Sequence, residues 1–150
     1  MGVLFDLVIA EEGAAEDIGK TERLFEDFRV FPTKRLDPVT VEGLFSLIDP
    51  TSSDIESWSQ APLYETEDVL WVYQWPPYFV ERLANLLESE RDDLAQRWSQ
   101  TEEVQNFYHW FSDLSPSDVA ADVGNFVNDL CLFASEAVEG RKCIFLRIIL

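Results

Sequence analysis

Three stretches of the chain are almost continuously apolar, and they lie at its beginning, middle and end. They are residues 3–9, 69–75 and 142–150, and their β-branched and aromatic side chains suit a pleated sheet. A short terminal strand without neighbours would leave its backbone groups unpaired. We therefore predict that the first and last stretches are strands of the same sheet.

Between these strands, apolar residues recur at helical spacing behind recognisable start signals. The motif Ser-Pro-Ser-Asp at residues 115–118 supplies an N-cap, an N1 proline and an N3 acid together, which predicts a helix that ends at a C-cap, Gly140. Phe126 lies in the middle of its apolar side and is predicted to belong to the core. The Asp-Pro pair at residues 37–38 is a similar start, and that helix is predicted to end at residues 49–50.

Other helical segments have weaker boundaries. Residues 76–98 begin with two prolines and carry one apolar stripe, while a capping-box pattern at residues 89–92 favours two helices over one. Residues 11–28 predict one weak helix, interrupted by glycines. Residues 51–62 are rich in Ser and Asp and are predicted to form a loop around Trp58.

Together these elements predict an α+β fold. The sheet is small, includes the N-terminal strand, a central strand and the C-terminal strand, and is packed with four to six helices. The chain has 150 residues, of which 47% are hydrophobic, so it can bury a sizeable core. Because no internal repeat, linker or low-complexity tract interrupts it, residues 1–150 are predicted to form a single α+β domain.

The net charge is the most unusual property of the composition. There are 29 Asp and Glu residues against 11 Lys and Arg, for a formal net charge of −18. Residues 36–81 and 98–140 contain no Lys or Arg at all, and only residues 20–35 are net basic. Such a field repels nucleic acid and anionic lipid and attracts basic proteins. The alternative is that the acidic residues serve solubility alone.

The remaining sequence features favour an intracellular protein. Cys131 and Cys143 are too few for a secreted disulfide framework, and both are predicted to be free and buried. The N-terminus has no basic residue before its apolar run, and no apolar stretch is long enough to span a membrane. We therefore expect a cytoplasmic protein that does not bind membranes.

Motifs that carry catalysis or cofactors are missing from the sequence. His109 is the single histidine, and no set of His and Cys has the spacing of a metal site. No nucleophile elbow, phosphate-binding loop or dinucleotide fingerprint occurs, so no catalytic residue, metal or cofactor is predicted. The many adjacent carboxylates are expected by chance in so acidic a chain and are interpreted as solvated surface.

Two aromatic clusters are the candidate binding residues. Trp71, Tyr73 and Trp75 would share one face of the central strand, as a core stripe under the helices or as a partly open aromatic wall. The second cluster combines the end of one helix with the start of the next. A partner would use a few aromatic anchors beside acids, and the complete candidate set is Trp58, Trp71, Tyr73, Trp75, Trp98, Glu102, Glu103, His109 and Trp110.

Four short segments resemble small, uncharacterised, acidic bacterial proteins. They are GVLFDL at residues 2–7, LDPVT at 36–40, RWSQTEE at 97–103 and EGR at 139–141. The resemblance implies a bacterial origin and an α+β fold, and it implies no activity. In size and charge such proteins are also similar to toxin-neutralising immunity proteins.

Three classes of function stay open on the sequence. The first is an acidic protein-interaction module with a basic protein partner, of which an immunity-type inhibitor and a mimic of nucleic-acid charge are two forms. The second is a small-molecule-binding or regulatory domain that uses the aromatic wall. The third is an enzyme of unrecognised class, which no motif supports. The oligomeric state is not predicted.

Overall fold

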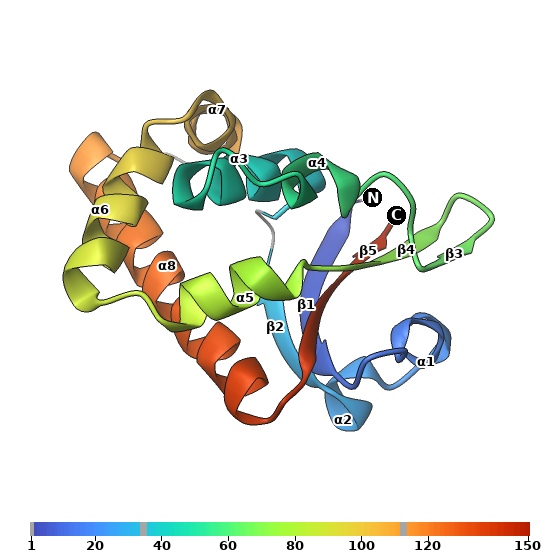
Figure 1. Ribbon diagram of the computed structural model, residues 1–150. Helices are drawn as coiled ribbons and strands as arrows, with labels where there is room; N and C mark the ends of the chain where they lie inside the picture. Colours follow the sequence, from blue (N-terminus) through green and yellow to red (C-terminus); the bar gives the residue numbers. More distant parts are fainter. Residues whose placement is uncertain (1, 34–35, 112–113) are drawn as a thin grey trace.

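The computed structural model describes residues 2–33, 36–111 and 114–150, with the backbone alone at 109–111. Its centre is an antiparallel sheet of five strands in the order β2-β1-β5-β4-β3 (Figure 1). The strands are β1 (Leu4–Ala10), β2 (Arg29–Thr33), β3 (Tyr64–Thr66), β4 (Leu70–Gln74) and β5 (Cys143–Ile149). The predicted α+β class is therefore confirmed.

The two ends of the chain meet in the middle of the sheet. β1 and β5 pair antiparallel over their whole lengths, with Asp6 opposite Arg147 and Leu7 opposite Leu146. β4 then pairs with the other edge of β5. This confirms that the first, central and last apolar stretches are strands of one sheet.

The two outer strands are absent from the sequence-based expectation. β2 has five residues and β3 has three, and both contain polar residues because an edge strand does not need apolar side chains on both faces. Pro32 lies in β2, where a strand that borders one neighbour tolerates the missing N–H. Short polar edge strands are therefore hard to recognise by apolar pattern.

The described residues contain eight helices, two more than the upper end of the predicted four to six: five have eight residues or more, and three are shorter. The long ones are α3 (Pro38–Ile48), α5 (Pro77–Ala84), α6 (Glu88–Ser99), α7 (Glu102–Phe111) and α8 (Pro116–Glu139). The short ones are α1 (Ala15–Lys20), α2 (Leu24–Asp27) and α4 (Asp54–Ser57). The single weak helix predicted over residues 11–28 is thus two helices, and the predicted loop at 51–62 contains α4.

Local capping fixes most of the predicted helix starts. The Ser115 hydroxyl accepts the Asp118 backbone N–H at 3.3 Å, and the Asp37 carboxylate accepts that of Thr40 at 2.8 Å. α5 and α6 are separate helices, as the sequence favours. The start of α6 uses a different acid from the predicted one, because the Glu90 carboxylate accepts the Leu87 backbone N–H at 2.9 Å.

The end of α8 is at the predicted C-cap, but the left-handed residue follows it. Gly140 is the C-cap, but its φ is −80°, and the left-handed residue is Arg141 with φ of 54°. The backbone N–H of Lys142 donates to the Ala137 carbonyl at 2.8 Å, and that of Arg141 donates to the Val138 carbonyl at 3.1 Å. This is a Schellman motif with arginine at the position that usually holds glycine.

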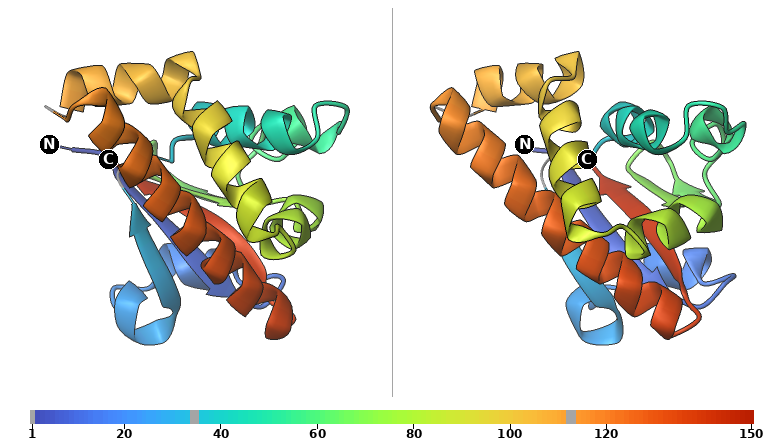
Figure 2. Two further views of the ribbon diagram at one scale, coloured as in Figure 1. Left: turned by 90° about the vertical axis from the view of Figure 1, so that its left-hand side faces the viewer. Right: turned by 60° about the vertical axis from the view of Figure 1, so that its left-hand side comes forward.

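The sheet has two unequally covered faces (Figures 1 and 2). On the face we call the major face, α5 and α8 contact β5, and α3, α6 and α7 pack around them. On the minor face, α1 lies over β3, β4 and β5, and α2 lies beside β2. Side chains alternate between the two cores, with Leu7 and Ile9 on the major face and Val8 and Ala10 on the minor face.

Phe126 belongs to the major core only in part. It is half-buried, with its ring 5.6 Å from that of Phe31 and 5.9 Å from that of Trp98. Two turns further along α8, Phe133 is 2% exposed. The apolar side of α8 is thus buried as predicted, but its centre lies nearer the C-terminal half of the helix.

Candidate functional site

The predicted aromatic wall lies on the major face of the sheet. Trp71 and Tyr73 are half-buried on β4, and Trp75 directly follows the strand with 0% of its surface exposed. The Trp75 ring packs edge-on against Phe45 of α3, with centroids 5.3 Å apart. Trp75 is therefore a core residue, whereas Trp71 and Tyr73 keep part of their rings at the surface.

Trp58 joins the exposed part of this wall. It follows α4, which is held to the core by the buried Ile55. The Trp58 ring lies 6.0 Å from that of Tyr73 and 5.9 Å from that of Phe45, edge-on to both. Its indole N–H has no acceptor among the described residues. Residues 58 and 73, distant in sequence, thus form one half-buried aromatic group.

Acidic side chains lie on the same elements as this group. Glu65 on β3 is exposed and lies directly opposite Trp71 on β4, so the two side chains share a face of the sheet. Burial, with a smaller contribution from the Glu65 carboxylate, raises the pKa of Tyr73 above its ordinary value. We define the acidic-aromatic surface as these residues with their exposed neighbours: Trp58, Trp71, Tyr73, Asp54, Glu56, Glu65, Glu67 and Asp68.

The tip of the β3–β4 hairpin presents two of these carboxylates. Glu67 and Asp68 have φ values of 27° and 60°, and the Val69 backbone N–H donates to the Thr66 carbonyl at 2.8 Å. The loop between the two strands has three residues, 67–69, and the positive φ of its first two is a conformation for which Gly and Asn are preferred. Glu-Asp at these positions is locally strained, and it places two negative charges at the end of an exposed hairpin.

The second predicted cluster lies elsewhere. Trp98, at the end of α6, is 3% exposed and packs on Phe126, while the Glu102 side chain is exposed and that of Glu103 is half-buried at the start of α7. This region lies on the opposite side of α3 from α4 and the β3–β4 hairpin (Figure 1). The structure therefore does not bring the two predicted clusters together.

Two predicted binding residues cannot be placed in either group. His109 and Trp110 belong to α7, but their side chains lie outside the described part of the structure.

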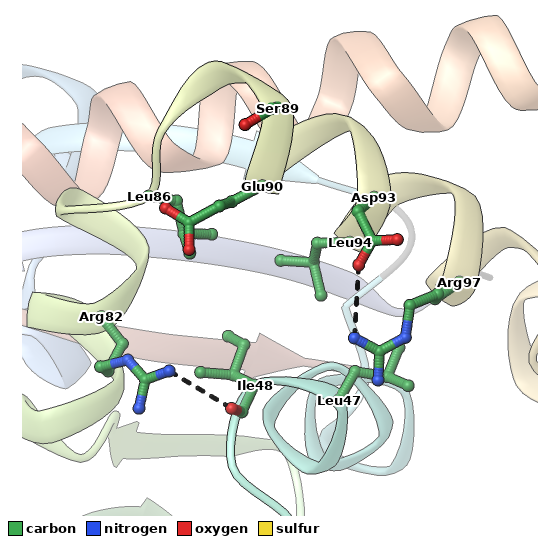
Figure 3. Close-up of a pocket in the computed structure, with 9 residues that line it drawn as sticks. All are labelled: Leu47, Ile48, Arg82, Leu86, Ser89, Glu90, Asp93, Leu94 and Arg97. Carbon is green, nitrogen blue, oxygen red and sulfur yellow. Dashed lines mark hydrogen bonds and ion pairs between the residues drawn. The ribbon is translucent and has the colours of Figure 1, made fainter.

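A cavity of about 350 Å³ opens between α3, α5 and α6 (Figure 3). Leu47, Leu86 and Leu94 form part of its wall. Arg97 is ion-paired with Asp93 at 3.5 Å, and Arg82 donates to the Ile48 carbonyl at 3.4 Å. Arg82 also donates to the Tyr78 hydroxyl, and Glu90 accepts the Leu87 N–H. Because these polar groups are bound to one another, the cavity offers a ligand few unpaired partners.

Neither cysteine has the environment of a nucleophile. Burial raises the pKa of the Cys131 thiol to about 11, and burial together with Glu12 and Glu11 raises that of Cys143. Within the described residues, no three His, Cys, Asp or Glu side chains are arranged to hold a metal ion. The acidic-aromatic surface is therefore the site on which we base the proposed function.

Comparisons with known proteins add no further evidence on the site. The chain matches no protein-family model, no curated protein and no solved structure. None of the helices in the described ranges has the length and apolarity needed to cross a membrane.

Proposed function

We propose that this protein is an interaction module that binds a basic partner protein through the acidic-aromatic surface. The observation that carries the proposal is the combination of half-buried Trp and Tyr rings with exposed carboxylates on α4 and the β3–β4 hairpin. Residues 36–81, which supply this whole surface, contain no Lys or Arg that could neutralise it. Inhibition of a nucleic-acid-binding protein by charge mimicry is one form of this function.

The two kinds of side chain would have different tasks. Exposed carboxylates attract a basic surface from a distance and raise the association rate, while contributing little to the lifetime of the complex. Trp58 and Trp71 offer half-buried rings on which a Lys or Arg side chain can stack. The Tyr73 ring packs edge-on against that of Trp58.

A small-molecule site on the aromatic wall has less support. Trp75, the third member of the wall, is fully buried against Phe45. Trp71 and Tyr73 line none of the four described cavities. An extended partner surface fits this geometry better than a concave ligand site.

The proposal is tested by capturing a partner from native lysate at about 50 mM salt and measuring its binding by surface plasmon resonance. Replacing three hairpin acids together (Glu65→Gln, Glu67→Gln, Asp68→Asn) should slow association by roughly tenfold and weaken its salt dependence. Trp71→Ala should instead raise the dissociation rate by roughly tenfold or more.

A matched control removes the same number of charges from the other side of the molecule. Glu88, Asp92 and Asp129 are exposed on α6 and α8, far from the hairpin in Figure 1. Their replacement by Gln, Asn and Asn should change the association rate much less. If both triple variants slow association equally, only the net charge matters. An association rate that does not change with salt concentration would overturn the proposal.

A further inference from the structure

The sheet has two outer edges, on β2 and β3, and the hydrogen bonds of the inner strands show which backbone groups face outward there. The Trp75 N–H donates to the Ile144 carbonyl at 2.9 Å, and the Leu150 N–H donates to the Val69 carbonyl at 3.0 Å. Backbone groups of successive residues point to alternate sides of a strand. The odd-numbered residues from 69 to 75 therefore face β5, and the even-numbered residues between them face β3.

On β3, this alternation leaves the backbone of Glu65 pointing away from the sheet. The even-numbered residues of β4 pair with Tyr64 and Thr66. Glu65 lies between these two, opposite Trp71, whose own N–H and C=O face β5. The Glu65 N–H and C=O therefore point away from β4, to the side on which no further described strand follows. They are a donor and an acceptor with which an added strand could pair.

The opposite edge of the sheet is blocked. The same alternation continues across β5 and β1 and turns Val30 and Pro32 of β2 outward. Pro32 has no N–H, and the Arg29 guanidinium donates to the Val30 carbonyl at 3.5 Å. Proline and charged side chains on an outer strand prevent a further strand from pairing. β3 contains no proline, so its backbone can still accept one.

The helix next to β3 covers its minor face and not its outer edge. α1 contacts β3, β4 and β5, so it lies across the face of these three strands. Its Gly19 adjoins the Tyr64 ring, whereas the Glu65 side chain belongs to the other face and is exposed. In Figure 1, the β3–β4 hairpin projects from the rest of the molecule. The edge of β3 is therefore accessible to a partner.

The side chains along β3 select the kind of strand that can bind. Glu65, Glu67 and Asp68 are acidic, and residues 36–81 contain no Lys or Arg. A second copy of this edge would place like charges opposite one another, which is unfavourable. A strand with Lys or Arg opposite Glu65 would instead gain an ion pair. Two residues before Glu65, Leu63 is 59% exposed and offers apolar surface to the same strand.

We propose that the basic partner binds in part as an extended strand that adds to the outer edge of β3. One residue of that strand, a Lys or Arg, would pair with the Glu65 N–H and C=O through its backbone and with the Glu65 carboxylate through its side chain. Its neighbours would lie on the minor face beside Tyr64 and Thr66, which are half-buried and suit β-branched residues. This mode of binding rests on the proposed function and adds the form of the partner segment: basic residues alternating with β-branched ones.

The test combines the full ¹⁵N-labelled chain with a short peptide of alternating lysine and valine. By NMR, the outward-facing Glu65 amide should exchange its hydrogen rapidly in the free chain and roughly tenfold more slowly, or slower still, with saturating peptide. N-methylation of the lysines removes the donors that would face β3 and should weaken binding by roughly tenfold or more. N-methylation of the valines, whose N–H groups would face outward, is the control with the same charge and should change binding much less. The proposal is wrong if the peptide does not bind, if the Glu65 amide is not protected by it, or if both methylated peptides bind equally.

Two substitutions at one position separate the backbone from the charge. Glu65→Gln removes the carboxylate and keeps the N–H, whereas Glu65→Pro removes both. Proline at an outward-facing position of an edge strand is tolerated, as Pro32 shows on β2. Glu65→Pro should therefore fold and bind the peptide roughly tenfold more weakly than Glu65→Gln. Equal affinities of the two folded variants would overturn the proposal, and the methylated peptides decide the matter if Glu65→Pro does not fold.

The captured partner separates this inference from the proposed function. In its complex, the Glu65 amide should be protected as it is with the peptide. If association still depends on salt and on the hairpin acids while this amide stays unprotected, the partner uses the acidic-aromatic surface without adding a strand. The proposed function would then stand, and the strand at β3 would be ruled out.

Discussion

The two faces of the sheet are stabilised in different ways. The major face is covered by the long helices and buries large apolar rings such as Phe45, Trp75 and Phe133. The minor face is covered by two short helices, and its centre contains an ion pair between Asp6 and Arg147 rather than another apolar pair. One sheet can therefore have a densely packed apolar core on one side and a sparsely covered polar contact on the other.

The Asp6–Arg147 contact illustrates the cost on the minor face. The two side chains are each 12% exposed and approach only to 3.9 Å, and the Arg147 Nε has no partner among the described residues. Burial raises the pKa of Asp6 and lowers that of Arg147, in each case against the opposing effect of the partner's charge. Both shifts mean that desolvation outweighs the attraction between the charges.

The largest expected effect is on the major face. Phe133→Ala should lower the free energy of unfolding by about 4 kcal/mol, because it removes a fully buried ring that packs 5.5 Å from Phe31. Phe126→Ala, on the same helix but half-buried, should cost about half as much. Chemical denaturation measures both, and equal costs would show that the two positions are equally buried in solution.

The next effect is on the minor face. Arg147→Met should cost about 3 kcal/mol at neutral pH, because it leaves the buried Asp6 carboxylate without a cation. The double variant Asp6→Leu with Arg147→Met should match the natural chain in stability or exceed it, by about 1 kcal/mol or more, because apolar residues carry no desolvation cost. A double variant less stable than the natural chain would show that the pair is net stabilising.

A smaller effect concerns the packing of α1 on the minor face. A Cβ placed on Gly19 would lie 2.1 Å from the Tyr64 ring, so Gly19→Ala must displace that ring. We expect a loss of about 2 kcal/mol by chemical denaturation. The same substitution made in a Tyr64→Ala background is the control, and it should cost much less. Equal costs in both backgrounds would mean that the ring is not the obstacle.

The smallest effect is the pH dependence of the minor face. Asp6 has a folded-state pKa above its ordinary value, so its destabilising contribution is fully present above that folded pKa. The contribution disappears as the pH falls toward the ordinary value of 3.8, because the folded state takes up the proton first. The stability advantage of the double variant over the natural chain should therefore shrink as the pH falls, and denaturation curves across this range measure it. An advantage that is constant or grows would contradict the direction of the shift.

The residues of the candidate sites could be predicted from the sequence only in part, because some of their features are local and others depend on the fold. The sequence singles out Trp58, Trp71 and Tyr73 as aromatic residues in an acidic segment, and the structure brings these three together at one surface. Trp75 does not belong to this surface, because the end of β4 places it in the core. The cavity bordered by Arg141 and Lys142 could not be predicted, because these two residues are an ordinary basic pair until the fold places α5 beside them.

Several features have local causes in the chain: the three apolar strands, the capped starts of α3 and α8, and the excess of charge. Apolar periodicity and capping act within a few residues, so they can be recognised without the fold. Long-range contacts, in contrast, produce the edge strands β2 and β3, the pairing of Asp6 with Arg147, and the burial of Trp75. These depend on which segments become neighbours, because a polar edge strand or a buried ion pair exists only through contacts between residues far apart in the chain.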